Sequence, residues 1–165
     1  MENREAVEVF KELLPAVESS LEKLATEGRD GSTVGKVTVL LNAVTEPCFL
    51  MCLEIMSKVL HLTKPLSQKL QSSQLDILKA VNSVDSCVRV LEEYRNGATF
   101  DIIFGHVEQS IGEPIPRPRH AKKQTHRANP PVTTAREHYR VAAFLSFIDT
   151  CLSQFRERFQ SHRSR

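Results

Sequence analysis

The sequence predicts an all-α protein: an irregular bundle of about five to six helices, with a Pro-rich basic linker before the C-terminal helix. Two observations support this prediction. Apolar residues recur every three or four positions along most of the chain, which is the spacing of one helix face. Only six of the 165 residues are glycine, fewer than strand-and-turn architectures need for their turns. The length corresponds to about one domain, enough to bury a single core.

The first predicted helix covers residues 5–27. Pro15 lies within its apolar pattern. Because proline lacks a backbone N–H and its ring clashes with the preceding turn, we expect a kink or a break there. Gly28 ends the pattern as a C-terminal cap residue. The apolar face consists of Ala6, Val9, Phe10, Leu13, Leu14, Val17, Leu21 and Leu24.

Two helices are expected to follow. The first covers residues 33–44, and Ser32 is its expected N-cap. Thr45 is expected to cap the second, which tolerates Pro47 in its first turn. The second helix is apolar on nearly every side, so we expect it to lie at the centre of the bundle, packed against several neighbours. Pro65 is expected to kink or end it.

A further pair of helical segments is predicted between residues 73 and 112. Ser73 and Asp76 resemble a capping box, and the helix that they open ends at Asn96-Gly97. Its apolar stripe consists of Ile77, Leu78, Val81, Val84, Val88 and Leu91. A short amphipathic segment closed by Gly112 follows, with Phe100, Ile103, Phe104 and Val107 as its apolar residues.

Residues 113–133 contain five prolines, which predicts an extended linker. Thr134 and Glu137 then form the capping box of a C-terminal helix with a wide apolar face that needs a partner surface. The chain is therefore expected to consist of a helical bundle at 1–112, the linker at 113–133 and the C-terminal helix at 134–165. The candidate interaction face on this helix consists of Tyr139, Leu145, Ile148, Leu152, Phe155 and Phe159.

Charge is distributed unevenly along the chain. Residues 1–113 carry 11 Lys and Arg against 17 Asp and Glu, whereas residues 114–136 carry six basic residues and no acidic one. A flexible run of cations can lie along a phosphate backbone without reading bases, and it also resembles a nuclear-import signal. Alternatively, the linker docks on the acidic part of the same chain. The candidate nucleic-acid-binding residues are Arg117, Arg119, Lys122, Lys123 and Arg127.

One stretch resembles a phosphate-binding loop. That motif needs four residues between its glycines and a Ser or Thr directly after its lysine. Here only three residues separate Gly31 from Gly35, and Val37 follows Lys36. A loop and a helix start are the better interpretation.

Cys48, Cys52, His120 and His126 are residue types that bind zinc. The cysteine pair and the histidine pair are several times farther apart than the dozen or so residues of a structural zinc finger. Because both cysteines lie in the apolar helix, we expect small buried side chains instead of ligands. No metal and no cofactor are predicted.

The sequence shows no constellation of catalytic residues. Cys151 and His138 lie too far apart on one helix for contact, and the adjacent Glu92 and Glu93 point in different directions. We therefore expect no enzyme and no small-molecule substrate, with a hidden active site as the third hypothesis. Neither a secretory signal nor an apolar run of the ~18–20 residues needed to cross a bilayer is visible. We expect an intracellular, nuclear protein without a membrane partner.

A set of short segments is spread over nearly the whole chain. They are Phe10–Leu13, Leu40–Asn42, Leu62–Gln71, Asp76–Ala80, Arg117–Arg119, Tyr139–Val141, Phe147–Asp149 and Phe155–Phe159. In their order and spacing, though in no single motif, these segments resemble hAT-superfamily transposases and host proteins derived from them, such as the zinc-finger MYM-type protein 1-like proteins and the repressor of the inhibitor of the protein kinase.

The resemblance implies that this chain corresponds to the helical insertion of a ribonuclease H-like transposase. The family's three metal-holding carboxylates would then lie before Met1 and after Arg165. The implied role is a non-catalytic interaction or assembly module, and its partners would be related transposase-like chains or a second copy of the chain. The alternative is weak, sequence-independent nucleic-acid binding through the basic linker.

Overall fold

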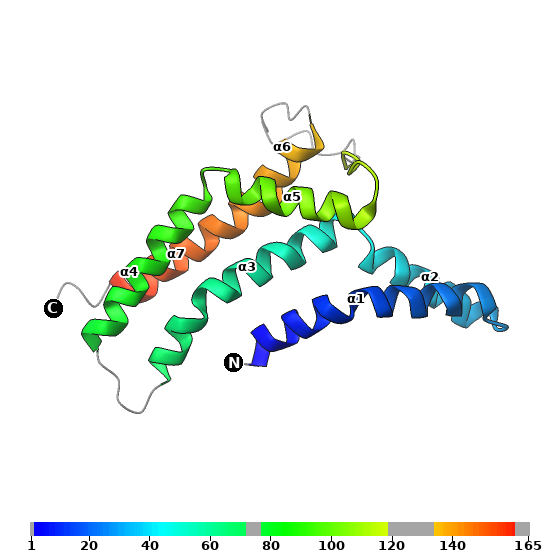
Figure 1. The fold of residues 1–165 in the computed structure, drawn as a ribbon, viewed down its shortest axis with the longest axis horizontal. Helices are drawn as coiled ribbons and strands as arrows, with labels where there is room; N and C mark the ends of the chain where they lie inside the picture. The colour runs from blue at the N-terminus through cyan, green and yellow to red at the C-terminus, as the bar shows by residue number, and fades with distance from the viewer. Residues whose placement is uncertain (1, 72–76, 119–133, 161–165) are drawn as a thin grey trace. The chain divides into compact units, whose positions relative to one another are not determined.

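All secondary structure in the described part of the chain is helical in the computed structural model, which confirms the all-α prediction (Figure 1). The structure describes residues 2–71, 77–118 and 134–160. The chain forms two compact units, Met1–Leu75 and Asp76–Arg165. The C-terminal helix shares the second unit with the two helices that precede the linker. The expected division into 1–112, 113–133 and 134–165 stays a prediction.

The first unit contains α1 (Glu2–Glu27), α2 (Gly31–Val44) and α3 (Pro47–Leu70). Helices α1 and α2 form an antiparallel hairpin, and α1 also packs against α3 (Figure 1). Two contacts join α1 to α3: the rings of Phe10 and Phe49 meet edge to face at 6.1 Å, and the Lys11 ammonium lies 2.8 Å from the Glu54 carboxylate. The buried apolar residues of this unit are Leu14, Leu21, Val44, Leu50, Met51, Leu53, Ile55, Val59 and Leu66.

Both internal prolines lie within continuous helices. Helix α1 passes through Pro15 and α3 passes through Pro65, so a break at the first and an end at the second were wrong expectations. An interior proline costs a helix about 3 kcal/mol or more. The residue next to each proline, Leu14 and Leu66, is buried, and this packing favours continuation of the helix.

Two expected N-caps are wrong. The Asp30 carboxylate caps α2, because it accepts hydrogen bonds from the backbone N–H groups of Ser32 and Thr33. Thr45 is the C-cap of α2 instead of the N-cap of α3, and its hydroxyl donates to the Leu41 carbonyl at 2.8 Å. Helix α3 begins with Pro47 in its first turn, as expected. The end of α1 before Gly28 is also confirmed.

The second unit contains α4 (Ile77–Tyr94), α5 (Ala98–Ile111), α6 (Ala135–Tyr139), the π-helix η1 (Arg140–Leu145) and α7 (Ser146–Gln160). Helices α4 and α7 lie side by side and antiparallel (Figure 1). Large fully buried side chains at the centre of this unit include Leu91, Phe100, Val107, Phe144, Ile148 and Leu152.

Several local predictions for the second unit hold. All four apolar residues predicted for α5 are buried, and this helix ends at Gly112, where the positive φ of 75° favours glycine. Thr134 caps α6 by accepting from the Glu137 N–H at 3.1 Å. Leu78 departs from the predicted α4 stripe, since it is 71% exposed. The predicted capping box at Ser73 and Asp76 lies outside the described residues.

Candidate interaction surfaces

The predicted face of the C-terminal helix is largely covered within its own unit. Tyr139, Ile148 and Leu152 are at most 5% exposed. Leu145, Phe155 and Phe159 are half-buried. The partner surface that this face needs is therefore supplied mainly by the chain itself.

Helix α4 supplies part of that surface. Val81, Val84 and Val88 of α4 and Phe155 and Phe159 of α7 line a small cavity of about 40 Å³ between the two helices. The two phenyl rings stack on one another with centroids 6.0 Å apart. Burial raises the pKa of the Cys151 thiol on the same helix, as expected for a side chain that lies partly in an apolar contact.

Ion pairs border the apolar contacts of this unit. The Arg95 guanidinium lies 3.0 Å from the Asp149 carboxylate, and Arg156 pairs with Glu92. Arg136 of α6 pairs with Asp101 of α5. All six side chains are about half exposed, so each pair fixes helix register more than it adds stability.

The π-helical turn η1 was not predicted. It brings Phe144 against Phe100, with ring centroids 5.3 Å apart, and both rings are fully buried. On the other side of this turn, the Arg140 guanidinium donates to the Arg95 carbonyl at 3.4 Å. A π turn adds a residue to the helical repeat and so changes which side chains face the neighbour. Periodicity in the sequence cannot show such a change.

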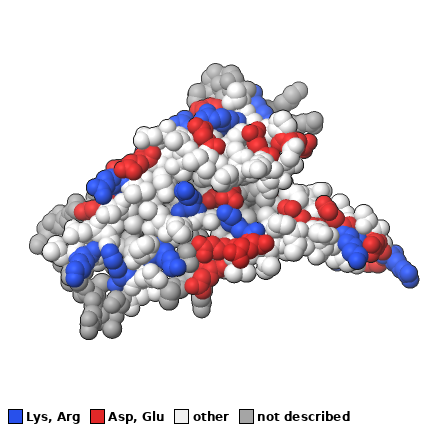
Figure 2. Space-filling model, viewed as in Figure 1, with Lys and Arg blue, Asp and Glu red and all other residues white. Residues whose placement is uncertain are grey.

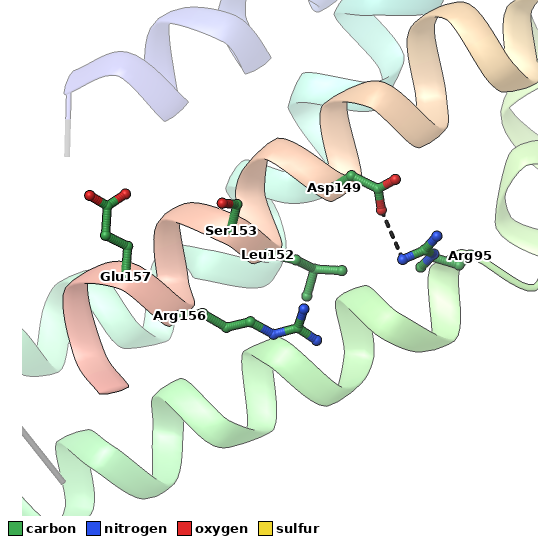
Figure 3. A pocket seen from close by; sticks show the side chains of 6 residues that line it. All are labelled: Arg95, Asp149, Leu152, Ser153, Arg156 and Glu157. Carbon is green, nitrogen blue, oxygen red and sulfur yellow. Dashed lines mark ion pairs between the residues drawn. The ribbon is translucent and has the colours of Figure 1, made fainter. Parts of the chain in front are cut away.

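An open depression of about 500 Å³ lies along α7. Five of its six lining residues are polar or charged, and Figure 3 shows the Arg156 side chain between α7 and α4, with the Arg95–Asp149 ion pair beside it. Both arginines already pair with carboxylates. An anionic ligand in the depression would therefore find neither arginine unpaired. The lining residues are Arg95, Asp149, Leu152, Ser153, Arg156 and Glu157.

The basic linker lies mostly outside the described residues. Of its five candidate residues the structure describes only Arg117, which is exposed; Arg119, Lys122, Lys123 and Arg127 fall in the part that is not described. Among charged residues that are described, acidic side chains gather over the N-terminal half of α1 (Figure 2).

The α1–α2 hairpin carries a surface that the sequence did not single out. Five large aliphatic side chains of the hairpin are each at least 50% exposed. Helix α2 contributes two of them although its only charged residue is Lys36. We call these residues the hairpin surface: Val9, Leu13, Leu24, Val39 and Leu40. The apolar pattern of α1 gave no signal for it, because the exposed leucines repeat with the same spacing as the buried ones.

The cysteines are not placed as predicted. Cys48 and Cys52, one turn apart on α3, are exposed, whereas Cys87 is buried. Partial burial and then the neighbouring Cys48 thiol raise the pKa of Cys52. A raised pKa disfavours the thiolate that would bind a metal or act as a nucleophile.

The described residues include no group of three or more His, Cys, Asp or Glu side chains placed to hold a metal ion. No single described helix is long and apolar enough to cross a membrane. Helices α2 and α3, which meet at a bend of 53°, reach that length and composition only as a pair.

No protein-family model matches the chain, and no solved structure matches it.

Proposed function

We propose that this chain is a non-catalytic protein-interaction and assembly module of a hAT transposase-derived protein, and that the hairpin surface is its contact region. The observation that carries the proposal is the exposure of five large aliphatic side chains on two adjacent helices. Clustered exposed apolar side chains commonly mark protein contacts. The proposed family rests on the resemblance described above.

The contrast within the chain supports this choice of surface. The face of α7 already packs within its unit, so its central residues Ile148 and Leu152 are unavailable to another protein. On α1, Leu13 and Leu24 are each 53% exposed. An external partner would gain more from covering the α1–α2 hairpin than from contacting α7.

The test is co-purification of the full chain with a related full-length transposase-like chain from co-expression. We expect a stoichiometric complex that is lost when Leu13 and Leu40 are both replaced by Glu. Leu78→Glu is the matched control, because Leu78 is an exposed leucine of α4 and lies outside the hairpin surface. If neither the wild-type chain nor any variant forms a complex with itself or with the related chain, the proposal is wrong.

A second candidate function is weak, sequence-independent nucleic-acid binding. It is favoured by the run of basic residues from Arg117 to Arg127, which contains no acidic residue. Duplex DNA titrated at increasing salt should bind with a steep salt slope, and replacing the five candidate residues by Ala should flatten it. A wild-type affinity that does not change with salt would exclude this function.

A further inference from the structure

We infer that the α1 part of the hairpin surface, Val9, Leu13 and Leu24, pairs with a second copy of this chain through an antiparallel contact between the two α1 helices. This inference rests on the proposed function, because it names the partner of the same surface. The observations that carry it are the order of large and small side chains along α1 and the charges beside them.

The exposed stripe of α1 contains both large and small side chains. Val9, Leu13, Ala16, Ser20 and Leu24 are all exposed, and their spacing of three or four residues places them on one face. In an antiparallel pair centred just after Ala16, Val9 of each copy lies opposite Leu24 of the other, and Leu13 lies opposite Ser20. Each Leu13 therefore meets a small side chain, and the Ala16 side chains at the centre let the two backbones approach closely.

The one hydroxyl in the stripe is compatible with burial. The Ser20 hydroxyl donates to the Ala16 carbonyl of its own helix at 2.7 Å. Because this donor is already satisfied, covering it with a second helix leaves no hydroxyl proton without a partner. A polar side chain that depended on solvent would disfavour the contact.

Charges beside the stripe complement one another between two copies. Glu12 and Lys23 are both exposed. Glu12 follows Val9 of the stripe by three positions, and Lys23 follows Ser20 by three positions. They therefore lie along the same edge of the stripe. They cannot pair within α1, because 11 residues separate them by ~16 Å. In the antiparallel pair, Glu12 of one copy and Lys23 of the other are separated along the helix axis by less than one helical turn, ~5.4 Å. Because the dimer is two-fold symmetric, this ion pair forms twice.

The contact is small. It extends over the four helical turns from Val9 to Leu24, and a single helix pair of this length belongs with transient interfaces that bury less than ~1,200 Å². We therefore expect a reversible dimer with a dissociation constant in the micromolar range. Sedimentation equilibrium of the full chain at ~10 to 500 μM would detect it.

Four variants and one control test the surface and the register. Leu13→Glu should weaken the dimer by about tenfold or more, because two charges would be buried without partners. Glu12→Lys and Lys23→Glu should each weaken it by about threefold to tenfold, and the double variant should recover the wild-type affinity. Leu78→Glu should have no effect. Circular dichroism checks that each variant keeps its helical content.

The register is read directly by cross-linking. A carbodiimide joins a carboxylate to an amine in direct contact, so an equimolar mixture of ¹⁴N- and ¹⁵N-labelled chains should give a mixed-isotope peptide linking Glu12 to Lys23. A monomer at every concentration would overturn the inference, as would a dimer that tolerates Leu13→Glu or cross-links only at other positions. If the chain is monomeric but still captures the related chain through Leu13 and Leu40, self-pairing is wrong while the proposed function stands.

Discussion

Helices α1 and α7 are both amphipathic, yet they differ in what covers their apolar faces. Ile148 and Leu152 on α7 are at most 2% exposed, whereas Leu13 and Leu24 on α1 are each 53% exposed. Helix α7 packs against α4. Valines of α4 lie next to phenylalanines of α7, and Glu92 of α4 pairs with Arg156 of α7. Helix α1 has an apolar surface wider than its two neighbours cover. An amphipathic pattern therefore shows that a face needs a partner, but not whether the partner lies in the same chain.

The strongest test of this contrast removes the central ring of the second unit. Phe144→Ala should cost about 3–5 kcal/mol of unfolding free energy, because it leaves a cavity beside Phe100. Tyr94 and Tyr139, the only tyrosines of a chain without tryptophan, both lie in this unit. Tyrosine fluorescence during urea unfolding should therefore report the loss.

Phe144→Leu is the matched control, because it keeps most of the buried volume and should cost clearly less. If Phe144→Ala changed the midpoint by less than the equivalent of ~1 kcal/mol, the π-helical turn would not be part of a packed core.

A matched pair of leucine substitutions compares the covered and uncovered faces directly. Leu152→Ala should cost about 2–5 kcal/mol, whereas Leu24→Ala should cost less than ~1 kcal/mol at concentrations where the chain is monomeric. Circular dichroism during urea unfolding would measure both. Equal losses at the two positions would show that the α1 stripe is covered after all.

A smaller effect is expected at the start of α2. Hydrogen bonds from the Thr33 hydroxyl and then from the Thr33 and Ser32 backbone hold the pKa of Asp30 below its ordinary value of 3.8. A carboxyl whose pKa is lowered by folding stabilises the fold above its ordinary pKa, and this contribution is lost as the pH falls through the folded-state pKa. Asp30→Ala should therefore lower the thermal midpoint at neutral pH.

The wild-type advantage over Asp30→Ala should decrease once the Asp30 carboxyl is protonated in both states, below its folded-state pKa, because a neutral carboxyl is a weaker acceptor. Asp30→Asn provides the control, because an asparagine side chain still accepts the cap hydrogen bonds but does not titrate. A wild-type advantage over Asp30→Ala that did not decrease in acid would contradict the assignment of this cap.

The smallest effect is expected for the ion pair between Arg156 and Glu92. Both side chains are nearly half exposed, so a double-mutant cycle with Arg156→Ala and Glu92→Ala should give a coupling below ~1 kcal/mol. Raising the salt concentration should reduce that coupling further. A larger, salt-independent coupling would mean that the α4–α7 contact depends on charge more than on its apolar side chains.

The local features of the fold were largely predictable from sequence. The glycine that ends α5 and the Thr134 cap depend on neighbouring positions only, and both were placed correctly. The caps at Ser32 and Thr45 failed for a local reason. Asp30 is a stronger acceptor two residues earlier, and the Thr45 hydroxyl donates back to the preceding turn.

The candidate sites were less predictable, because exposure depends on which elements meet. Periodicity assigned Leu78 to a packed stripe and Cys48 and Cys52 to a buried helix, but all three side chains are exposed. The π turn at residues 140–145 changes the helical repeat without any mark in the sequence. The hairpin surface was hidden for the same reason, since an uncovered leucine and a buried one form the same pattern.

The sequence by itself determined that this chain is helical, where most of its helices begin and end, and which faces are apolar. Those properties arise from hydrogen bonds and side-chain spacing within a few residues. Only the tertiary structure decided that α7 is covered by its own unit while Leu13 and Leu24 of α1 face outward. Burial depends on contacts between residues that are distant in sequence, and periodicity carries no information about those contacts.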